Sequence, residues 1–530
     1  MTSYDGVIIG AGHNSLVMAA YLTRAGLKIA VLERNDRVGG GCTTEEPALP
    51  GYRFNIHSNF YMGFRHAPFM RDLELYRYGF SFVEPLVQQG TTFSDGTCIV
   101  LHQDLEASCA AIARFSKRDA DTFRELSLRY DQEMRPLLTS LRYNAPLPPD
   151  VLRDRLSGPQ GKEFLSHGRF DLFGVIRHYF EHERVRTMFA ALMHVGTIEN
   201  APGAGALFPG SMAAVRAYTL PVGGSASFTR ALERVLEAGG SRVICNADVR
   251  EIVVENGRAT GVRLDTGETV RATRFVASGI DAPTTMRISG EEHYSQSVRD
   301  KLKNWYWGNH SSVTLHLALK RPPTYRSAAY DPEIGKAFNI FFGMDSLDDI
   351  EASFHDCETG RFPSILMGNG ACNSAVDPLY APAEGHVAFW WPFAPYSVDG
   401  SPSNWDDRAE DYAARLLEHW RAHSDNLDGD NIRASHLATP LDYERLNVNM
   451  VQGAARMGAW VPSQLGYNRP HPELSGTRTP IEGLYLCGSS TTGAGGGLNG
   501  APGYIAANAV SDDLGLVRTW TPVPAPEWTH

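Results

Sequence analysis

The sequence predicts an α/β protein with two domains, one built on a parallel sheet and a second, α+β domain with an antiparallel sheet and helices. Two observations lead to this prediction. At 530 residues, the chain is too long for one compact core. A strand–helix–strand pattern opens the sequence and a strand and helix return near its end, whereas the middle has helical and then short-strand patterns.

The opening pattern indicates a βαβ unit. Val7–Ile9 is a short β-branched run, typical of a buried parallel strand. Asn14–Arg24 has apolar residues at helical spacing, and Gly26 ends it. Lys28–Glu33 gives the second strand. Many α/β domains contain such a unit, so the residues of its loop are needed to predict which ligand it binds.

The rest of the chain changes character twice. Residues 91–220 have mainly helical periodicity. Residues 241–279 predict short strands with turns, and 311–319 alternates like a strand of an antiparallel sheet. A strand at 483–488 and a helix at 503–510 return to the first pattern.

These changes divide the chain into interleaved domains, followed by a proline-rich tail that we expect to be extended and loosely packed. The predicted ranges are 1–90, 218–290 and 450–515 for the first domain, 91–217 and 291–449 for the substrate domain, and 516–530 for the tail.

Composition excludes several classes of protein. The net charge of −11, from 49 basic and 60 acidic residues, argues against nucleic acid as a partner. The seven cysteines show no CxxC spacing, so we expect neither a disulfide framework nor a metal site. The sequence has no signal peptide pattern and no apolar run long enough to cross a membrane. We therefore expect a cytoplasmic protein, with peripheral contact to a membrane left open.

The loop after the first strand has the composition of a phosphate-binding turn. Gly10 supplies the tight turn, and Gly12 lets the backbone approach a pyrophosphate at the helix N-terminus. His13, Asn14 and Ser15 begin the helix, with Ser15 where a third glycine is usual. We expect Ser15 to be tolerated with a slightly wider gap between helix and strand. Glu33, at the end of the second strand, can accept hydrogen bonds from ribose hydroxyls, which suits NAD or FAD and disfavours NADP.

The segment "ERNDRVGGGCTTEE" separates the two dinucleotides. It resembles the E-x(3)-R-x-G-G extension of the glutathione-reductase-type FAD family, which includes the amine oxidases and phytoene desaturases. The resemblance implies a Rossmann domain that binds FAD, with backbone donors and an arginine around the diphosphate and ribityl chain. The residues that it assigns to the cofactor here are Glu33, Arg34, Arg37, Gly39, Gly40 and Gly41.

Two further segments are similar to the same family. The stretch from "YTLPVGG" to "LDTGE" matches the phytoene desaturase pattern, in which Val249 contacts the adenine. "GLYLCGSSTTGAGGGLNGAPGYIAANAV" matches the C-terminal flavin motif. Gly488 ends its strand, Ser489 replaces a common aspartate, and Gly497, Leu498 and Asn499 are expected beside the flavin pyrimidine ring. The resemblance is to the branch of carotenoid desaturases, isomerases and ketolases.

The resemblance implies an FAD-dependent desaturase, or dehydrogenase, that introduces a C=C bond by hydride transfer to flavin N5. Aromatic-rich stretches at 305–319 and 338–396 favour an apolar or alicyclic substrate. The electron acceptor would be oxygen or a quinone. His57 and Tyr61, in a segment that passes near the flavin in relatives, are the candidate catalytic residues, and His194 is another possibility.

Three alternatives remain open at this point. A flavin amine oxidase would have an aromatic cage beside the flavin. A carotenoid ketolase or isomerase would share the motifs of the desaturases. A non-catalytic binding protein, like the Rab escort and GDP-dissociation-inhibitor relatives, would share the fold without a working flavin site.

Overall fold

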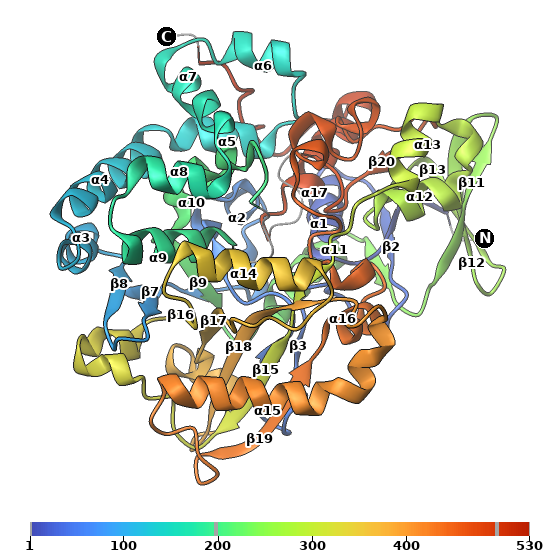
Figure 1. Cartoon of the computed structure of the whole chain (residues 1–530). Helices are drawn as coiled ribbons and strands as arrows, with labels where there is room; N and C mark the ends of the chain where they lie inside the picture. The colour runs from blue at the N-terminus through green and yellow to red at the C-terminus, as the bar shows by residue number, and fades with distance from the viewer. Residues whose placement is uncertain (1–2, 195–199, 493–497, 529–530) are drawn as a thin grey trace.

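The computed structural model of the protein describes residues 3–194, 200–492 and 498–528. It contains two large sheets and a layer of helices (Figure 1). Among the described residues, no helix is both long and apolar enough to span a lipid bilayer.

The first sheet has seven strands, in the order β10-β2-β1-β13-β12-β11, with β20 paired to the end of β13. Strands β10, β2, β1, β13 and β20 run parallel, whereas β11 and β12 form an antiparallel extension. The sheet therefore takes its strands from three separate parts of the chain. Their bounds are β1 Ser3–Ile9, β2 Ile29–Leu32, β10 Arg242–Ile244, β11 Val249–Glu255, β12 Arg258–Leu264, β13 Thr269–Ser278 and β20 Leu484–Leu486.

Helices α1 (His13–Arg24) and α17 (Ala501–Asp513) pack closely against this sheet and each other. A Cβ atom on Gly503 would lie 1.9 Å from the Asn14 carbonyl oxygen, so only glycine allows this approach. Ser15 is accommodated by a second glycine, because a Cβ on Gly279 would lie 1.9 Å from the Ser15 Oγ. The expected tolerance of serine therefore depends on glycine in the facing strand end.

The second sheet has eight strands, in the order β19-β15-β18-β17-β16-β7-β8, with β14 also paired to β18. All its pairs are antiparallel except β16 with β7. The bounds are β7 Val87–Thr92, β8 Cys98–His102, β14 His310–Ser312, β15 Thr314–Leu319, β16 Asn339–Phe342, β17 Gly368–Ala371, β18 His386–Pro395 and β19 Ile432–Ala438. Five short strands pair outside the two large sheets: β3 Thr44–Glu45, β4 Phe54–Asn55, β5 Tyr61–Met62, β6 Phe82–Val83 and β9 Tyr218–Pro221.

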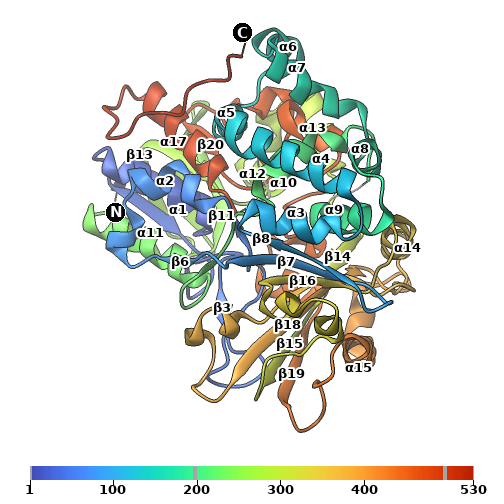
Figure 2. The ribbon, with the colours of Figure 1, turned by 90° about the vertical axis from the view of Figure 1, so that its left-hand side faces the viewer.

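A helical layer lies above the second sheet and beside the first (Figures 1 and 2). Most of its helices come from the middle of the chain: α3 Leu105–Ala113, α4 Lys117–Leu128, α5 Arg135–Tyr143, α6 Pro149–Arg155, α7 Pro159–Ser166, α8 Leu172–Tyr179, α9 Glu183–His194 and α10 Phe208–Ala214. The other helices are α2 Pro68–Asp72, α11 Ala226–Ala238, α12 Ala282–Ser289, α13 Gln296–Lys303, α14 Leu347–Glu358, α15 Trp405–His423 and α16 Pro440–Leu446.

The structure differs from the sequence expectations at two places. The mainly helical stretch begins with strand β8, and the expected domain border at residue 90 falls inside β7, which belongs to the second sheet. The tail is not loosely packed: Trp520 is buried and its indole N–H donates to the Asn508 side-chain oxygen at 3.0 Å. The tail packs because its backbone finds hydrogen-bond partners on helices, which its proline content does not indicate.

Candidate active site

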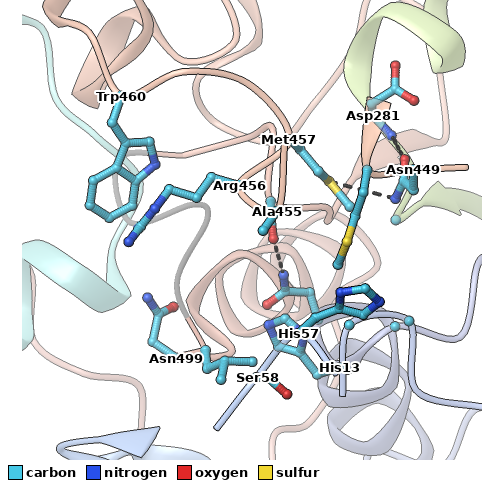
Figure 3. Close-up of a pocket in the computed structure, with 18 of the residues that line it drawn as sticks. His13, His57, Ser58, Asp281, Asn449, Ala455, Arg456, Met457, Trp460 and Asn499 are labelled. Carbon is cyan, nitrogen blue, oxygen red and sulfur yellow. Dashed lines mark hydrogen bonds between the residues drawn. The ribbon is translucent and has the colours of Figure 1, made fainter. Parts of the chain in front are cut away.

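A large cavity of about 1070 Å³, lined by residues that the structure describes, joins the carboxyl ends of the parallel strands to the helical layer. Its volume lies just above the roughly 300–1,000 Å³ typical of small-ligand sites. The part near α1 is polar, and Figure 3 shows His13, His57 and Ser58 there, with Asp281, Asn449, Met457 and Arg456 on the other side. The cavity is large enough for a ligand longer than an ordinary substrate.

The N-terminus of α1 opens directly into this cavity. Gly10 has a left-handed φ of 84°, which makes the turn after β1. Gly12 is the N-cap residue, no side chain among the described residues caps the helix, and its first turn carries no acidic residue. A Cβ atom on Gly12 would meet no atom of the described part of the chain within 4 Å, so the glycine keeps the cavity wall open. This end of α1 can therefore receive an anionic group at close range.

A hydrogen bond between Asn14 and Ser489 connects an early and a late segment of the chain in the cavity wall. The Asn14 side-chain nitrogen donates to the Ser489 hydroxyl at 3.0 Å. The buried Asn14 side-chain oxygen has no partner among the described residues, although both residues line the cavity. A buried acceptor without a donor is costly. A ligand hydroxyl or N–H at this place would satisfy it.

Glu33 is buried at the end of β2 and lines the cavity. Its carboxylate accepts hydrogen bonds from the backbone N–H of Ala11 at 2.8 Å and of Asn35 at 3.0 Å. Burial raises the pKa of Glu33, and these two bonds oppose that rise by stabilising the charged form. The side chain is thus oriented before any ligand arrives.

The glycine extension after Glu33 packs against the turn that holds α1. The Gly39 N–H donates to the Ala11 carbonyl at 3.0 Å. A Cβ on Gly40 would lie 3.1 Å from the Gly12 Cα, so the two turns are in close contact. Gly40, Gly41 and Arg34 line the cavity. Arg37 does not, because its exposed guanidinium pairs with Glu45 at 2.7 Å.

The residues assigned to the adenine and flavin ends also meet this cavity, with exceptions. Val249, Leu498 and Asn499 line it, whereas Gly488 does not. Gly488 instead packs against the chain, since its Cβ would lie 2.5 Å from the Gly279 carbonyl oxygen. Gly497 lies outside the described residues, as does the side chain of His194.

The two candidate catalytic residues have different surroundings. His57 lines the cavity and makes an edge contact with Tyr443, with ring centroids 4.9 Å apart. Burial lowers the pKa of His57 to about 4, so the imidazole is neutral at pH 7. Tyr61 is fully buried in the core against Phe64 and Phe228 and does not line the cavity. The expectation that Tyr61 faces the site is therefore corrected: β5 turns its ring into the core.

The sequence expectations missed several lining residues in a loop between α16 and β20. The Arg456 guanidinium lies over the Trp460 ring, 4.0 Å from its centroid (Figure 3). Both residues line the cavity. Burial lowers the pKa of Arg456 to about 10, which leaves it positively charged at pH 7. No local motif marks this arginine, and the aromatic residue four positions later is its only signal in the sequence.

Most of the residues that the helical layer contributes to the cavity wall are apolar, although Arg142 and Asn144 also line it. Apolar side chains come from α5, the loop that follows it, α6, α7 and the residue before α10: Leu138, Leu141, Leu147, Leu152, Phe164 and Leu207. An apolar chamber continuous with a polar, glycine-rich one suits an apolar ligand that meets a polar cofactor.

Comparison with known proteins agrees with this arrangement. A family model for the NAD(P)-binding Rossmann-like domain matches residues 8–74. The chain is 32% identical to one of the subunits of the limonene dehydrogenase of Castellaniella defragrans, over 98% of this chain and 96% of the relative. It is 26% identical to a hydroxyneurosporene desaturase of Cereibacter sphaeroides, over 96% and 97% of the two chains. The chain belongs to the phytoene desaturase-like branch of the FAD-dependent amine oxidase superfamily.

Solved structures agree on the fold. A putrescine oxidase variant superposes with a TM-score of 0.60, over 97% of this chain and 99% of the other, at 16% identity. The expected fold class, a Rossmann-type domain with a second α+β domain, is thus confirmed. As a member of the phytoene desaturase-like branch, the chain is an oxidoreductase of the dehydrogenase and desaturase group, acting on CH–CH groups.

Proposed function

We propose that the protein is an FAD-dependent dehydrogenase that introduces a C=C bond into an apolar or alicyclic substrate. The observation that carries this proposal is that one cavity has both a polar part, at the N-terminus of α1, and an apolar chamber beside the helical layer. Relatives named as limonene dehydrogenase and hydroxyneurosporene desaturase support a largely apolar substrate. An acceptor such as oxygen or a quinone would reoxidise the cofactor.

The residues of the polar part fit FAD. The bare backbone at Gly12 and the uncapped N-terminus of α1 suit the pyrophosphate. Glu33 would hold the adenosine ribose, and Val249 would contact the adenine. The unpartnered Asn14 oxygen would accept from a hydroxyl of the ribityl chain. Leu498 and Asn499 would lie at the pyrimidine end, before the N-terminus of α17.

A bound flavin supplies a hydride acceptor at N5. His57 is then the proposed base: its neutral imidazole can take the proton that leaves the carbon next to the one that loses hydride. The apolar side chains around the chamber would orient the substrate and exclude water. Arg37, which pairs with Glu45, and Gly39 and Gly488, which pack against backbone, would support the site from outside the cavity.

An amine oxidase is the main alternative reaction. A protonated amine would have to enter a cavity whose wall carries the charged Arg456 guanidinium. Like charges repel, which favours a neutral group at the part of the wall beside Arg456. We also propose a division into domains. In this division, the cofactor domain comprises the three segments of the chain that build the first sheet.

The test is anaerobic mixing of the flavin-loaded protein with a limonene-type cyclic hydrocarbon, an acyclic carotenoid precursor, a cyclic ketone and a cyclic amine. We expect the flavin band to bleach with a hydrocarbon or the ketone and to persist with the amine. Bleaching by the amine alone would replace the proposed function with amine oxidation. Persistence of the band with every compound would reject the dehydrogenase proposal.

A further inference from the structure

The C-terminal tail forms part of the wall of the apolar chamber. The tail leaves α17 and runs past α5 toward α6 and α7, as both views show (Figures 1 and 2). Pro526 is buried and lines the cavity, whereas its neighbours Ala525 and Glu527 are exposed. At Pro526 a single segment of chain therefore separates the cavity from solvent.

Hydrogen bonds fasten the tail on the near side of Pro526. The Tyr504 hydroxyl accepts from the Val523 N–H at 2.9 Å. The Pro524 carbonyl accepts from the Ser140 hydroxyl at 2.6 Å and from the Asn144 side chain at 2.9 Å. These contacts tie the tail to α17 and to the C-terminal end of α5.

A second set of bonds fastens the tail beyond Pro526. The Trp528 N–H donates to the Arg155 carbonyl at 2.7 Å, and the Gly158 N–H donates to the Trp528 carbonyl at 2.8 Å. These partners lie at the end of α6 and before α7, and the Trp528 ring packs against the helical core. The tail thus bridges two groups of helices whose side chains, among them Leu141 and Leu152, line the same chamber.

We propose that residues 523–528 are the outer wall of the substrate chamber and that Pro526 limits the size of the hydrocarbon that it admits. The inference rests on the proposed function, because it takes the chamber as the substrate site. A rigid proline with anchored backbone on both sides cannot swing aside as a free side chain could. Enlarging this side chain should shorten the chamber, and reducing it should lengthen the chamber.

The experiment compares Pro526→Phe, Pro526→Ala and wild type, with Ala525→Phe as the matched control because Ala525 is the exposed neighbour in the same tail. The two phenylalanine variants add the same ring, one at the cavity wall and one on the outer surface. The probes are a monoterpene, a sesquiterpene and a diterpene hydrocarbon. Binding is followed by the change in tryptophan emission as the hydrocarbon displaces water, since Trp391 and Trp460 line the cavity. This readout does not require turnover, and thermal unfolding of each variant checks that it is folded.

We expect Pro526→Phe to weaken binding of the largest probe that wild type accepts by about tenfold, with smaller probes less affected. Pro526→Ala should extend the series toward larger probes, and Ala525→Phe should match wild type. Identical size profiles for the four proteins, or an equal change from Ala525→Phe, would overturn the proposal. The size profile could change although no hydrocarbon or ketone bleaches the flavin. That result would support Pro526 as a wall residue and reject the proposed reaction.

Discussion

The carboxylate of Glu33 accepts a hydrogen bond from the backbone N–H of Ala11 at 2.8 Å, which ties the end of β2 to the glycine turn after β1. One acidic side chain therefore holds the turn and faces the ligand. Replacing it with Arg reverses the charge at the proposed ribose site and leaves the Ala11 donor without its acceptor.

We expect Glu33→Arg to lose most of its bound FAD. The measurement is the ratio of flavin to protein absorbance after purification, with the melting temperature recorded alongside. Asp36→Arg is the control, since that nearby carboxylate is exposed and does not line the cavity. A full complement of FAD in Glu33→Arg would remove the residue from the cofactor site.

Gly12→Ala separates folding from cofactor binding. The added methyl group would meet no atom of residues 3–194, 200–492 or 498–528 within 4 Å, and Gly12 has an ordinary φ of −71°. The apoprotein should keep its melting temperature, whereas the methyl group should weaken the binding of FAD by about 1–3 kcal/mol through overlap with the pyrophosphate. Titration of apoprotein with FAD measures this. Gly335→Ala, at an exposed glycine with equally open space, should bind FAD like wild type; equal affinity in both variants would contradict the assigned pyrophosphate position.

Ser15 and Gly279 should show strong coupling in their effects on the free energy of unfolding. Gly279→Ala places a Cβ 1.9 Å from the Ser15 Oγ and should destabilise the protein by about 1–3 kcal/mol. In a Ser15→Gly background part of that cost should disappear, because the hydroxyl is gone. Denaturant unfolding of the four proteins gives the coupling energy. Additive effects would mean that this contact does not set the distance between α1 and the sheet.

The partly buried His57 should make the free energy of unfolding depend on pH. Its pKa of about 4 in the folded protein lies below the unfolded value of about 6.5, so the unfolded chain binds more protons between these values. The free energy of unfolding should therefore fall as the pH decreases from 6.5 to 4, by about 3 kcal/mol for this group.

Denaturant unfolding at several pH values tests this in wild type, His57→Gln and the control His355→Gln, whose side chain is exposed. The free energy of unfolding should depend less steeply on pH in His57→Gln than in wild type, and His355→Gln should match wild type. The same variant should keep its flavin and reduce it more slowly with substrate. An unchanged slope would contradict the buried environment, and an unchanged reduction rate would clear His57 of the proposed role as base.

Much of the polar wall was accessible to sequence reasoning because local chain geometry produces it. Gly12 and Glu33 lie at the ends of adjacent parallel strands, and any right-handed βαβ unit brings such positions together. The first sheet and α17 bring three more residues to the same cavity: Val249 begins β11, Ser489 follows β20 and Asn499 precedes α17. These positions depend on backbone topology rather than on side-chain packing.

The remaining features depend on packing that no local pattern records. Strand β7 carries Gln88 and Gln89, polar residues that are buried because they donate to the carbonyls of Tyr218 and Val215. Tyr61 and His57 are close in sequence, but only His57 faces the cavity. Pro526 becomes a wall residue only once α5, far away in the sequence, supplies anchors for the tail.

The central claim is that one cavity holds FAD with its adenine end at Glu33 and its ring at Asn499. Releasing the cofactor from purified protein by heat and identifying it by mass tests the cofactor itself most directly. The account predicts a yellow protein that absorbs at about 450 nm and releases FAD. A nicotinamide dinucleotide in the extract, or a colourless protein that FAD cannot reconstitute, would contradict it.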